Sequence, residues 1–294
     1  MRYGALEAGG TKMVCAIGDE NGNLLEQYTI PTLTPEKTMP ELIRYFAERR
    51  IDALGIGAFG PVDVVPGSES FGKILHTPKV AWRDYNIVEP FVQALSVPVG
   101  LDTDVNAACL GEVMYGAAKG LTDVVYLTVG TGIGAGIYSG GRLVHGMLHP
   151  EGGHILIQRH PKDSGECICP CHTHCLEGLA SGPSIEKRWG RKAIALTDCA
   201  EVWELESDYL AQGIMNLLLI LSPQRIILGG GVMQQKQLFP LVRQKLAKKL
   251  NGYYDTPELR RLETYVVPAG LDGAQGIMGC LYLAQNAKLL ETIE

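Results

Sequence analysis

The chain has 294 residues, of which 46% are hydrophobic and 20% charged, and its formal net charge at pH 7 is −6. This is the composition of a globular protein with room for one large domain or two medium ones. The acidic balance argues against a general nucleic-acid binder, which would carry a basic surface. Because no signal peptide precedes the first expected strand and no apolar segment approaches the ~20 residues of a membrane span, we expect a cytoplasmic protein without a membrane partner.

The first part of the chain is expected to open with three strands and then alternate strands with helices. Asn21-Gly22, between the second and third strands, is a pair typical of tight hairpins. Thr34 and Pro35 mark a plausible helix start. The expected strands are residues 3–8, 13–18, 24–30, 53–59 and 98–101. The expected helices are residues 35–50 and 105–115.

The second part repeats this pattern. Its expected strands are residues 124–129, 135–138, 142–145, 225–228 and 263–267. Its expected helical regions are residues 184–221, 237–250 and 274–290. Two glycine-bearing hairpins about 120 residues apart suggest a duplicated domain with one phosphate-facing loop per copy, with chance similarity as the alternative. The alternation of strands and helices predicts an α/β protein. The apolar segment 214–221 fits either a core helix or a subunit interface.

One segment, residues 149–177, concentrates side chains that bind metals: it holds four of the eight cysteines and five of the seven histidines. Thiolates and imidazoles about three positions apart can share one tetrahedral Zn²⁺. Disulfides or free thiols are the alternative, and disulfides are rare inside cells. The segment contains a Cys-x-x-His-x-x-Cys motif and a histidine fifteen residues upstream of it. The candidate ligands are His154, Cys169, His172 and Cys175, with Cys167 and Cys171 as spare candidates.

Glycine is abundant, with 36 residues, and three clusters that contain it directly follow apolar strand-like segments. Glycines at such places let backbone N–H groups face phosphate oxygens, or let a flat nucleoside approach the chain. The first cluster is neither a P-loop nor a Rossmann fingerprint, because its spacing differs and a strand follows it. Glu7 beside it could hold Mg²⁺, usually through waters. Tight turns without a ligand are the alternative for each cluster. The clusters are Gly9-Gly10-Thr11-Lys12, Gly130-Thr131-Gly132-Ile133-Gly134 and Gly229-Gly230-Gly231.

Asp104 lies where a strand is expected to end and a helix to begin. A carboxylate there could cap the helix, or it could accept the proton of an alcohol that attacks phosphorus. Asp102 competes for the second role, because the alternation of a strand would turn both side chains to the same side.

Six motifs in this order resemble the ROK sugar kinases of the actin-like ATPase superfamily, most closely the bacterial zinc-containing fructokinases. The resemblance runs from about Tyr3 to Ala284. It implies a two-domain actin-like ATPase (ribonuclease H-like) fold with a small zinc-binding subdomain. The N-terminal lobe would comprise residues 1–115 and the C-terminal helix, about 275–294, and the other lobe residues 116–274 with the zinc loop 149–177. The motifs are EAGGTK, DTDVNAA, VGTGIGAG, HPEGGH, CPCHTHCLEGLASGP and IILGGGV.

The resemblance also implies roles for single residues. Asp104 would be the catalytic base and would contact the sugar, whose hydroxyls would otherwise be bound by Glu151, His154 and Glu177. The ATP phosphates would lie against Gly9, Gly10, Thr11, Lys12, Gly130, Thr131 and Gly132. The adenosine would be bordered by Pro183, Gly229, Gly230 and Gly231. A structural zinc would be held by His154, Cys169, His172 and Cys175.

These implications describe an ATP-dependent kinase that converts D-fructose to fructose 6-phosphate, uses Mg²⁺ and Zn²⁺, forms a homodimer and closes two domains over the sugar. Four positions depart from the family pattern. Glu7 replaces the Asp of many relatives, which mildly favours fructose, and Thr103 replaces an Asn found in glucose-type members. Cys171 and His174 occupy positions that are usually aromatic and acidic, which adds both as possible alternative metal ligands.

Three alternatives stay open. The nearest is a kinase for mannose, glucose or an amino sugar, because hexoses share many hydroxyls. The second is a sugar-responsive repressor, disfavoured because the two residues before the first strand leave no helix-turn-helix. The third is a non-catalytic sugar-binding protein.

Overall fold

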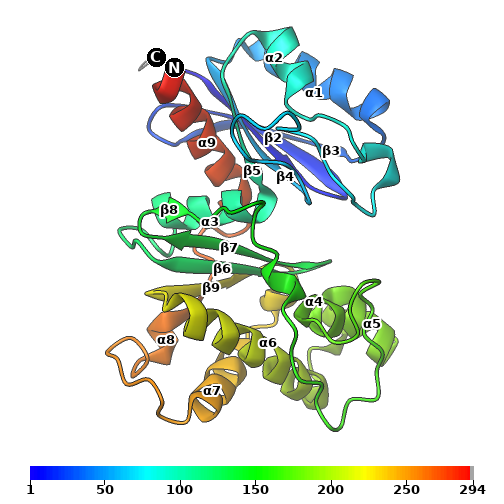
Figure 1. Ribbon diagram of the computed structural model, residues 1–294, viewed down its shortest axis with the longest axis vertical. Coiled ribbons are helices and arrows are strands. Elements are labelled where there is room, and N and C mark those ends of the chain that lie inside the picture. The colour runs from blue at the N-terminus through cyan, green and yellow to red at the C-terminus, as the bar shows by residue number, and fades with distance from the viewer. Residues whose placement is uncertain (292–294) are drawn as a thin grey trace. The chain divides into compact units, whose positions relative to one another are not determined.

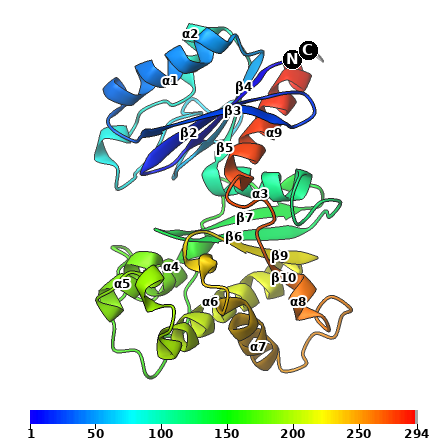
Figure 2. The same ribbon diagram turned by 180° about the vertical axis from the view of Figure 1, so that it is seen from behind.

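The computed structural model describes residues 1–291, with side chains up to Leu289. The chain divides into two compact units. Of the described residues, the first unit comprises 1–119, 143–149 and 274–291, and the second comprises 120–142 and 150–273. The expected extension of the last helix over 292–294 lies outside the described residues. Figures 1 and 2 show the elements of each unit from opposite sides.

A five-stranded mixed sheet forms the centre of the first unit, with the order β3-β2-β1-β4-β5. The first three strands are antiparallel, and β4 and β5 continue the sheet parallel to β1. The strands are β1 (Tyr3–Ala8), β2 (Lys12–Gly18), β3 (Leu24–Pro31), β4 (Ala53–Ala58) and β5 (Val99–Thr103). The helices are α1 (Pro35–Arg49), the 3₁₀ turn η1 (Val80–Trp82), α2 (Glu89–Leu95), α3 (Asp104–Met114) and α9 (Gln275–Glu291).

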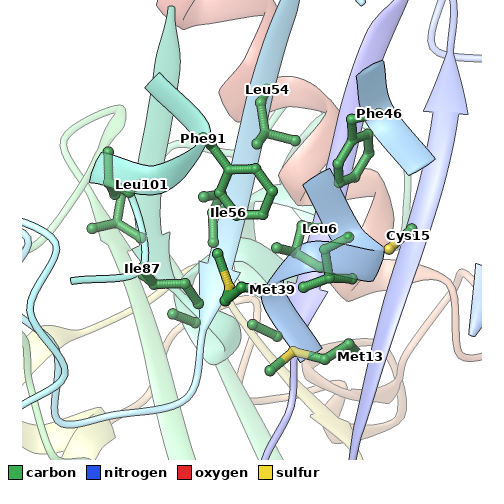
Figure 3. Packing of buried hydrophobic residues seen from close by; sticks show 14 of the residues in the cluster. Leu6, Met13, Cys15, Met39, Phe46, Leu54, Ile56, Ile87, Phe91 and Leu101 are labelled. Carbon is green, nitrogen blue, oxygen red and sulfur yellow. The ribbon is translucent and has the colours of Figure 1, made fainter. Parts of the chain in front are cut away.

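The alternation of large and small residues along β4 decides which helices cover each face of this sheet. Leu54 and Ile56 are fully buried in the cluster that α1 and α2 complete with Phe46 and Phe91, as Figure 3 shows. Gly55 turns to the other face, where α9 lies so close that an added Cβ would come within 1.8 Å of the Cys280 carbonyl oxygen. The small residues therefore permit close helix packing, and the large residues form the core.

The sheet of the second unit has the order β10-β9-β6-β7-β8, which read backwards has the connectivity of the first sheet. In both sheets an antiparallel hairpin is followed by parallel strands, which supports the interpretation of a duplicated domain. The strands are β6 (Val124–Val129), β7 (Ile133–Ser139), β8 (Arg142–Leu143), β9 (Arg225–Gly229) and β10 (Val266–Pro268). The α-helices are α4 (Leu176–Ala180), α5 (Gly182–Trp189), α6 (Ala200–Leu221), α7 (Leu238–Leu250) and α8 (Leu262–Tyr265). The 3₁₀ turns are η2 (Gly152–His154), η3 (Ala193–Leu196) and η4 (Val232–Gln234).

Several element predictions were wrong or incomplete. The strand expected at 263–267 begins only at Val266, because Leu262–Tyr265 forms a helical turn in which the Thr264 hydroxyl donates to the Arg261 carbonyl. The helix α2 was not foreseen, and the strand expected at 142–145 ends at Leu143.

The apolar segment 214–221 belongs partly to the core and partly to the surface. Ile214, Leu217 and Leu218 are buried, whereas Leu219 is 40% and Ile220 77% exposed. None of the helices within residues 1–291 combines the length and the apolar character that a membrane crossing requires.

Candidate functional site

The turn between β1 and β2 has the form of an anion-binding loop. The Gly9 N–H donates to the Lys12 carbonyl at 3.1 Å. Thr32, the residue after β3, holds the turn: its N–H donates to the Thr11 carbonyl at 3.0 Å, and its hydroxyl to the Gly9 carbonyl at 2.7 Å. The N–H groups of Gly10 and Thr11 have no hydrogen-bond partner among the described residues. Successive N–H groups in such a turn can bind phosphate oxygens.

Glu7 is the last but one residue of β1, close to this turn, and it lies against the beginning of α9. A Cβ added to Gly276 would come 2.6 Å from the Glu7 Cδ, so glycine is needed there to leave room for the carboxyl group. Burial raises the pKa of Glu7, and Lys12 opposes this shift.

Asp104 is the first residue of α3, and β5 ends one residue earlier at Thr103. The expectation that Asp102 and Asp104 share one side of a strand is therefore wrong. The helix cap is Thr103, whose hydroxyl accepts from the Asn106 N–H at 3.1 Å. Asp104 is half-buried, and its Oδ1 accepts from the Val105 N–H at 2.8 Å. The Asp104 carboxylate is thus not required as the cap.

Asp102 is 4% exposed, and three donors surround its carboxylate. Oδ1 accepts from the Thr103 N–H at 2.8 Å and from the Asn106 side-chain amide at 2.7 Å. Oδ2 lies 2.9 Å from His145 Nε2. These contacts make Asp102 the weaker candidate base. The sequence offered no signal for the pair with His145, because no spacing rule connects positions so far apart.

We expect His145→Gln to destabilise the protein more at about pH 6 than at about pH 9. The hydrogen bond to Asp102 raises the pKa of His145. The contribution of the pair is therefore fully present below the unfolded-state pKa of His, and it is lost as the pH rises through the raised folded-state pKa. Melting temperatures of the wild type and the variant across this range measure it, with exposed His76→Gln as the control. An equal difference at both pH values would contradict the assignment.

In the second unit two glycine clusters lie side by side, because β6 and β9 pair in parallel. A Cβ added to Gly130 would lie 3.8 Å from the Gly231 nitrogen. Gly230 has φ +89°, and an added Cβ there would come 2.4 Å from the Val129 carbonyl oxygen, so only glycine fits. The Gly182 N–H donates to the Gly130 carbonyl at 2.8 Å, which brings the neighbouring Pro183 to the same place. The structure thus brings together the second-unit residues that we expected around a nucleotide.

Four side chains of the second unit gather as a metal-binding group: His154, Cys169, His172 and Cys175. Their candidate ligand atoms all lie within 4.8 Å of one another. The Sγ of Cys169 is 3.9 Å from His154 Nδ1 and 3.4 Å from His172 Nδ1. Ligand atoms around a tetrahedral Zn²⁺ are separated by roughly 3.3–3.8 Å, given Zn–S and Zn–N bonds of about 2.3 and 2.0–2.1 Å. The donor set and its spacing therefore fit zinc.

The spare candidates have other partners or lie apart from this group. The Cys167 thiol donates to the His172 carbonyl at 3.1 Å, His174 Nδ1 lies 2.7 Å from the Thr173 hydroxyl, and Cys171 is exposed. All eight cysteines are free. Burial raises the pKa of the Cys175 thiol to about 12, and a bound divalent cation would favour the thiolate.

The two glutamates expected at the sugar flank the metal-binding group in the sequence. Glu151 is exposed, and its carbonyl accepts from the His154 N–H at 2.9 Å. Glu177 lies on α4, with Oε2 accepting from the Ile133 N–H at 2.8 Å and Oε1 3.8 Å from His154 Nε2. One oxygen of Glu177 is therefore engaged by the backbone that follows the Gly130–Gly132 loop.

Comparison with known proteins extends this picture. The family model described as "ROK family" matches residues 3–287. A putative fructokinase from Bacillus subtilis (strain 168) is 50% identical over 285 residues, 97% of this chain and 95% of the relative. A fructokinase from Pediococcus pentosaceus is 45% identical over 287 residues, 98% of this chain and 99% of the relative. The crystal structure of a ROK hexokinase from Thermus thermophilus is similar with a TM-score of 0.79 at 28% identity, and the alignment covers 100% of this chain and 99% of that chain.

These similarities extend over nearly the whole chain, as the six motifs indicated. They confirm the expected α/β class and the actin-like ATPase fold, with its two mixed sheets. The chain therefore belongs to the ROK family.

Proposed function

We propose that this protein transfers the γ-phosphoryl group of ATP to the 6-hydroxyl of D-fructose. The observation that carries the proposal is the arrangement at the carboxyl edge of the first sheet. The Gly9–Lys12 turn follows β1 and Asp104 follows β5, and these strands run parallel through β4. Ligands of open α/β sheets bind outside the carboxyl ends of the strands. The names of the close relatives support fructose as the acceptor.

In the proposed reaction, Asp104 accepts the proton of the sugar hydroxyl as its oxygen attacks the γ-phosphorus. The new P–O bond forms as the bond to the β-phosphate oxygen breaks, and ADP leaves. Backbone N–H groups of Gly10, Thr11, Thr131 and Gly132 bind phosphate oxygens; none of the four has a hydrogen-bond partner among the described residues. Glu7 beside the turn would hold Mg²⁺, usually through waters, and the bound ion would offset negative charge on the phosphoryl oxygens.

The remaining residue roles belong to the same proposal. His154, Cys169, His172 and Cys175 would hold a structural zinc, which with four protein ligands would have no open position to activate water. Glu151, His154 and Glu177 bind sugar hydroxyls, and Pro183 with Gly229–Gly231 borders the adenosine. Because ATP is the phosphoryl donor, we place the reaction in the cytoplasm. A homodimer is the assembly we propose, and the exposed Leu219 and Ile220 on α6 offer apolar surface for it.

A coupled assay of ADP release over fructose, mannose, glucose and an amino sugar tests the proposed substrate. We expect the highest kcat/KM for fructose, with the 6-phosphate identified by NMR of the product. A higher value for another hexose would overturn the fructose assignment. Absence of transfer to every sugar of the panel would overturn the kinase itself.

A further inference from the structure

Ile133, the first residue of β7, is held between two parts of the metal-binding segment. Its N–H donates to the Glu177 carboxylate at 2.8 Å. On its carbonyl side the backbone of Gly153 packs so closely that an added Cβ would come within 1.7 Å of the Ile133 oxygen. Gly153 directly precedes the candidate ligand His154, and Glu177 follows the candidate ligand Cys175 by two residues. Both contacts therefore originate next to the metal-binding group.

A second contact fixes the other end of the Gly130–Gly132 loop. The Gly182 N–H, at the beginning of α5, donates to the Gly130 carbonyl at 2.8 Å. The short α4 connects this contact to Cys175, because Cys175 is its N-cap and its Sγ accepts from the Gly178 N–H at 3.3 Å. The hydroxyl of Ser184 ties the two helices together by donating to the Gly178 carbonyl at 2.9 Å. The loop is thus held at both ends by one helical segment that starts at a candidate metal ligand.

The loop itself contributes little rigidity. Its internal hydrogen bond runs from the Gly130 N–H to the Gly132 carbonyl at 2.9 Å. Glycines leave a backbone free to adopt many conformations, so contacts from outside decide which one is populated. A Cβ added to Gly132 would come 2.6 Å from Glu177 Oε2. Glycine at this position therefore also makes room for the carboxylate that holds the loop.

Besides the candidate ligands, backbone hydrogen bonds connect the parts of the metal-binding segment, among them one from the Ile168 N–H to the Gly178 carbonyl at 2.9 Å. The Leu176 N–H donates to the Ile155 carbonyl at 3.0 Å, and the Ile157 N–H to the His174 carbonyl at 3.0 Å. The candidate ligand His154 directly precedes Ile155 in the first of the two paired stretches. The candidate ligand Cys169 lies before His174, on the chain that leads into the second stretch. A metal bound by both would therefore fix the position of Gly153 relative to α4, and with it both sides of Ile133.

We propose that the metal-binding group positions the Gly130–Gly132 loop for the nucleotide, with Glu177 as the positioning residue that transmits the effect. The inference rests on the proposed function, in which this loop binds the phosphates of ATP. Zinc then supports nucleotide binding as well as sugar binding, and it does so without contact between the metal and the nucleotide.

The test measures ADP–Mg²⁺ affinity by calorimetry without sugar, so that a role of Glu177 at the sugar does not enter. Zinc is removed with a chelator selective for zinc over magnesium, and its loss is verified by metal analysis. We expect the Kd for ADP to rise about tenfold or more, in keeping with lost hydrogen bonds to a charged group, and to recover when zinc is restored. Amide hydrogen exchange of residues 130–134 is expected to accelerate in parallel, while exchange in β1 and β4 stays unchanged. Unchanged affinity and exchange after zinc removal would overturn the proposal.

Glu177→Gln separates positioning from folding. The amide has the shape of the carboxylate, but one of its two terminal groups is a donor facing either the Ile133 N–H or the His154 ring. We expect normal zinc content and a raised Kd for ADP, and a smaller further increase on zinc removal than the wild type shows, because both changes break one connection. Glu186→Gln on the exposed side of α5 is the matched control. Fully additive effects of the variant and of zinc removal would exclude Glu177 as the connecting group.

Gly130→Ala, whose added Cβ would lie 3.8 Å from the Gly231 nitrogen and would not meet Glu177, distinguishes failure of this inference from failure of the proposed function. If the loop binds no phosphate, this variant leaves ADP affinity unchanged in the zinc-loaded protein, while exchange at residues 130–134 still responds to zinc. If the variant abolishes ADP binding, the loop binds the nucleotide. If zinc removal from the wild type then changes neither its affinity for ADP nor the amide exchange of residues 130–134, the proposed coupling is wrong.

Discussion

Asp104→Asn is expected to lower kcat for fructose phosphorylation by about 10²–10⁴-fold, the usual contribution of a general base. The amide keeps the size of the carboxylate and can still accept from the Val105 N–H, but it cannot take the proton of the attacking hydroxyl. Fructose affinity is expected to stay close to that of the wild type, because the other proposed sugar ligands are unchanged. Steady-state kinetics give kcat, and calorimetry gives the Kd for fructose.

Asp102→Asn is the matched control, with the same substitution two positions away. Its carboxylate accepts from the Asn106 amide and lies 2.9 Å from His145 Nε2. The change should therefore lower the melting temperature, and it should lower kcat much less than Asp104→Asn does. A kcat near the wild-type value in Asp104→Asn would refute the base assignment. Loss of turnover confined to Asp102→Asn would transfer that role to Asp102.

Removal of the proposed zinc, or Cys169→Ser, is expected to lower the melting temperature by about 5–10 °C and to depress activity. The four candidate ligands connect residues 154 and 169–175, and Cys175 also caps α4. Without the metal the buried Cys175 thiol and its neighbours lose the charge that would favour the thiolates. Calorimetric melting with and without added zinc, together with metal analysis, measures the effect.

Cys171→Ser is the control for this experiment, because Cys171 is exposed and lies outside the metal-binding group. It should keep its zinc, its melting temperature and its activity. If verified metal removal changes neither melting nor turnover, the zinc is not structural. If Cys171→Ser loses zinc while Cys169→Ser retains it, the ligand set is wrong.

Most strands and helices could be predicted because their signals are local. Large and small residues alternate along β4, Asn21-Gly22 lies at a hairpin, and Thr34 is the N-cap of α1, which begins at Pro35. The strand prediction at 263–267 was wrong for a physical reason as well. The run Thr264-Tyr265-Val266-Val267 is rich in strand-forming residues, yet hydrogen bonds to Arg261 hold its first part in a helical turn.

The choice between Asp102 and Asp104 could not come from spacing. It depends on the residue at which β5 ends, and on a histidine 43 positions away that engages Asp102. Likewise, the sequence singled out Glu177 beside the metal-binding motif, but not that its Oε2 accepts from the Ile133 N–H, 44 positions away.

The amino-acid sequence by itself determined the α/β class, the family, the glycine turns and the candidate metal ligands, because each is a pattern among residues close together in the chain. Only the tertiary structure decided that His145 engages Asp102, that the spare Cys167 thiol donates to the His172 carbonyl, and how the metal-binding segment holds the Gly130–Gly132 loop. Those contacts join segments distant in the chain. Their geometry follows from the packing of the sheets and helices, which no short stretch of sequence specifies.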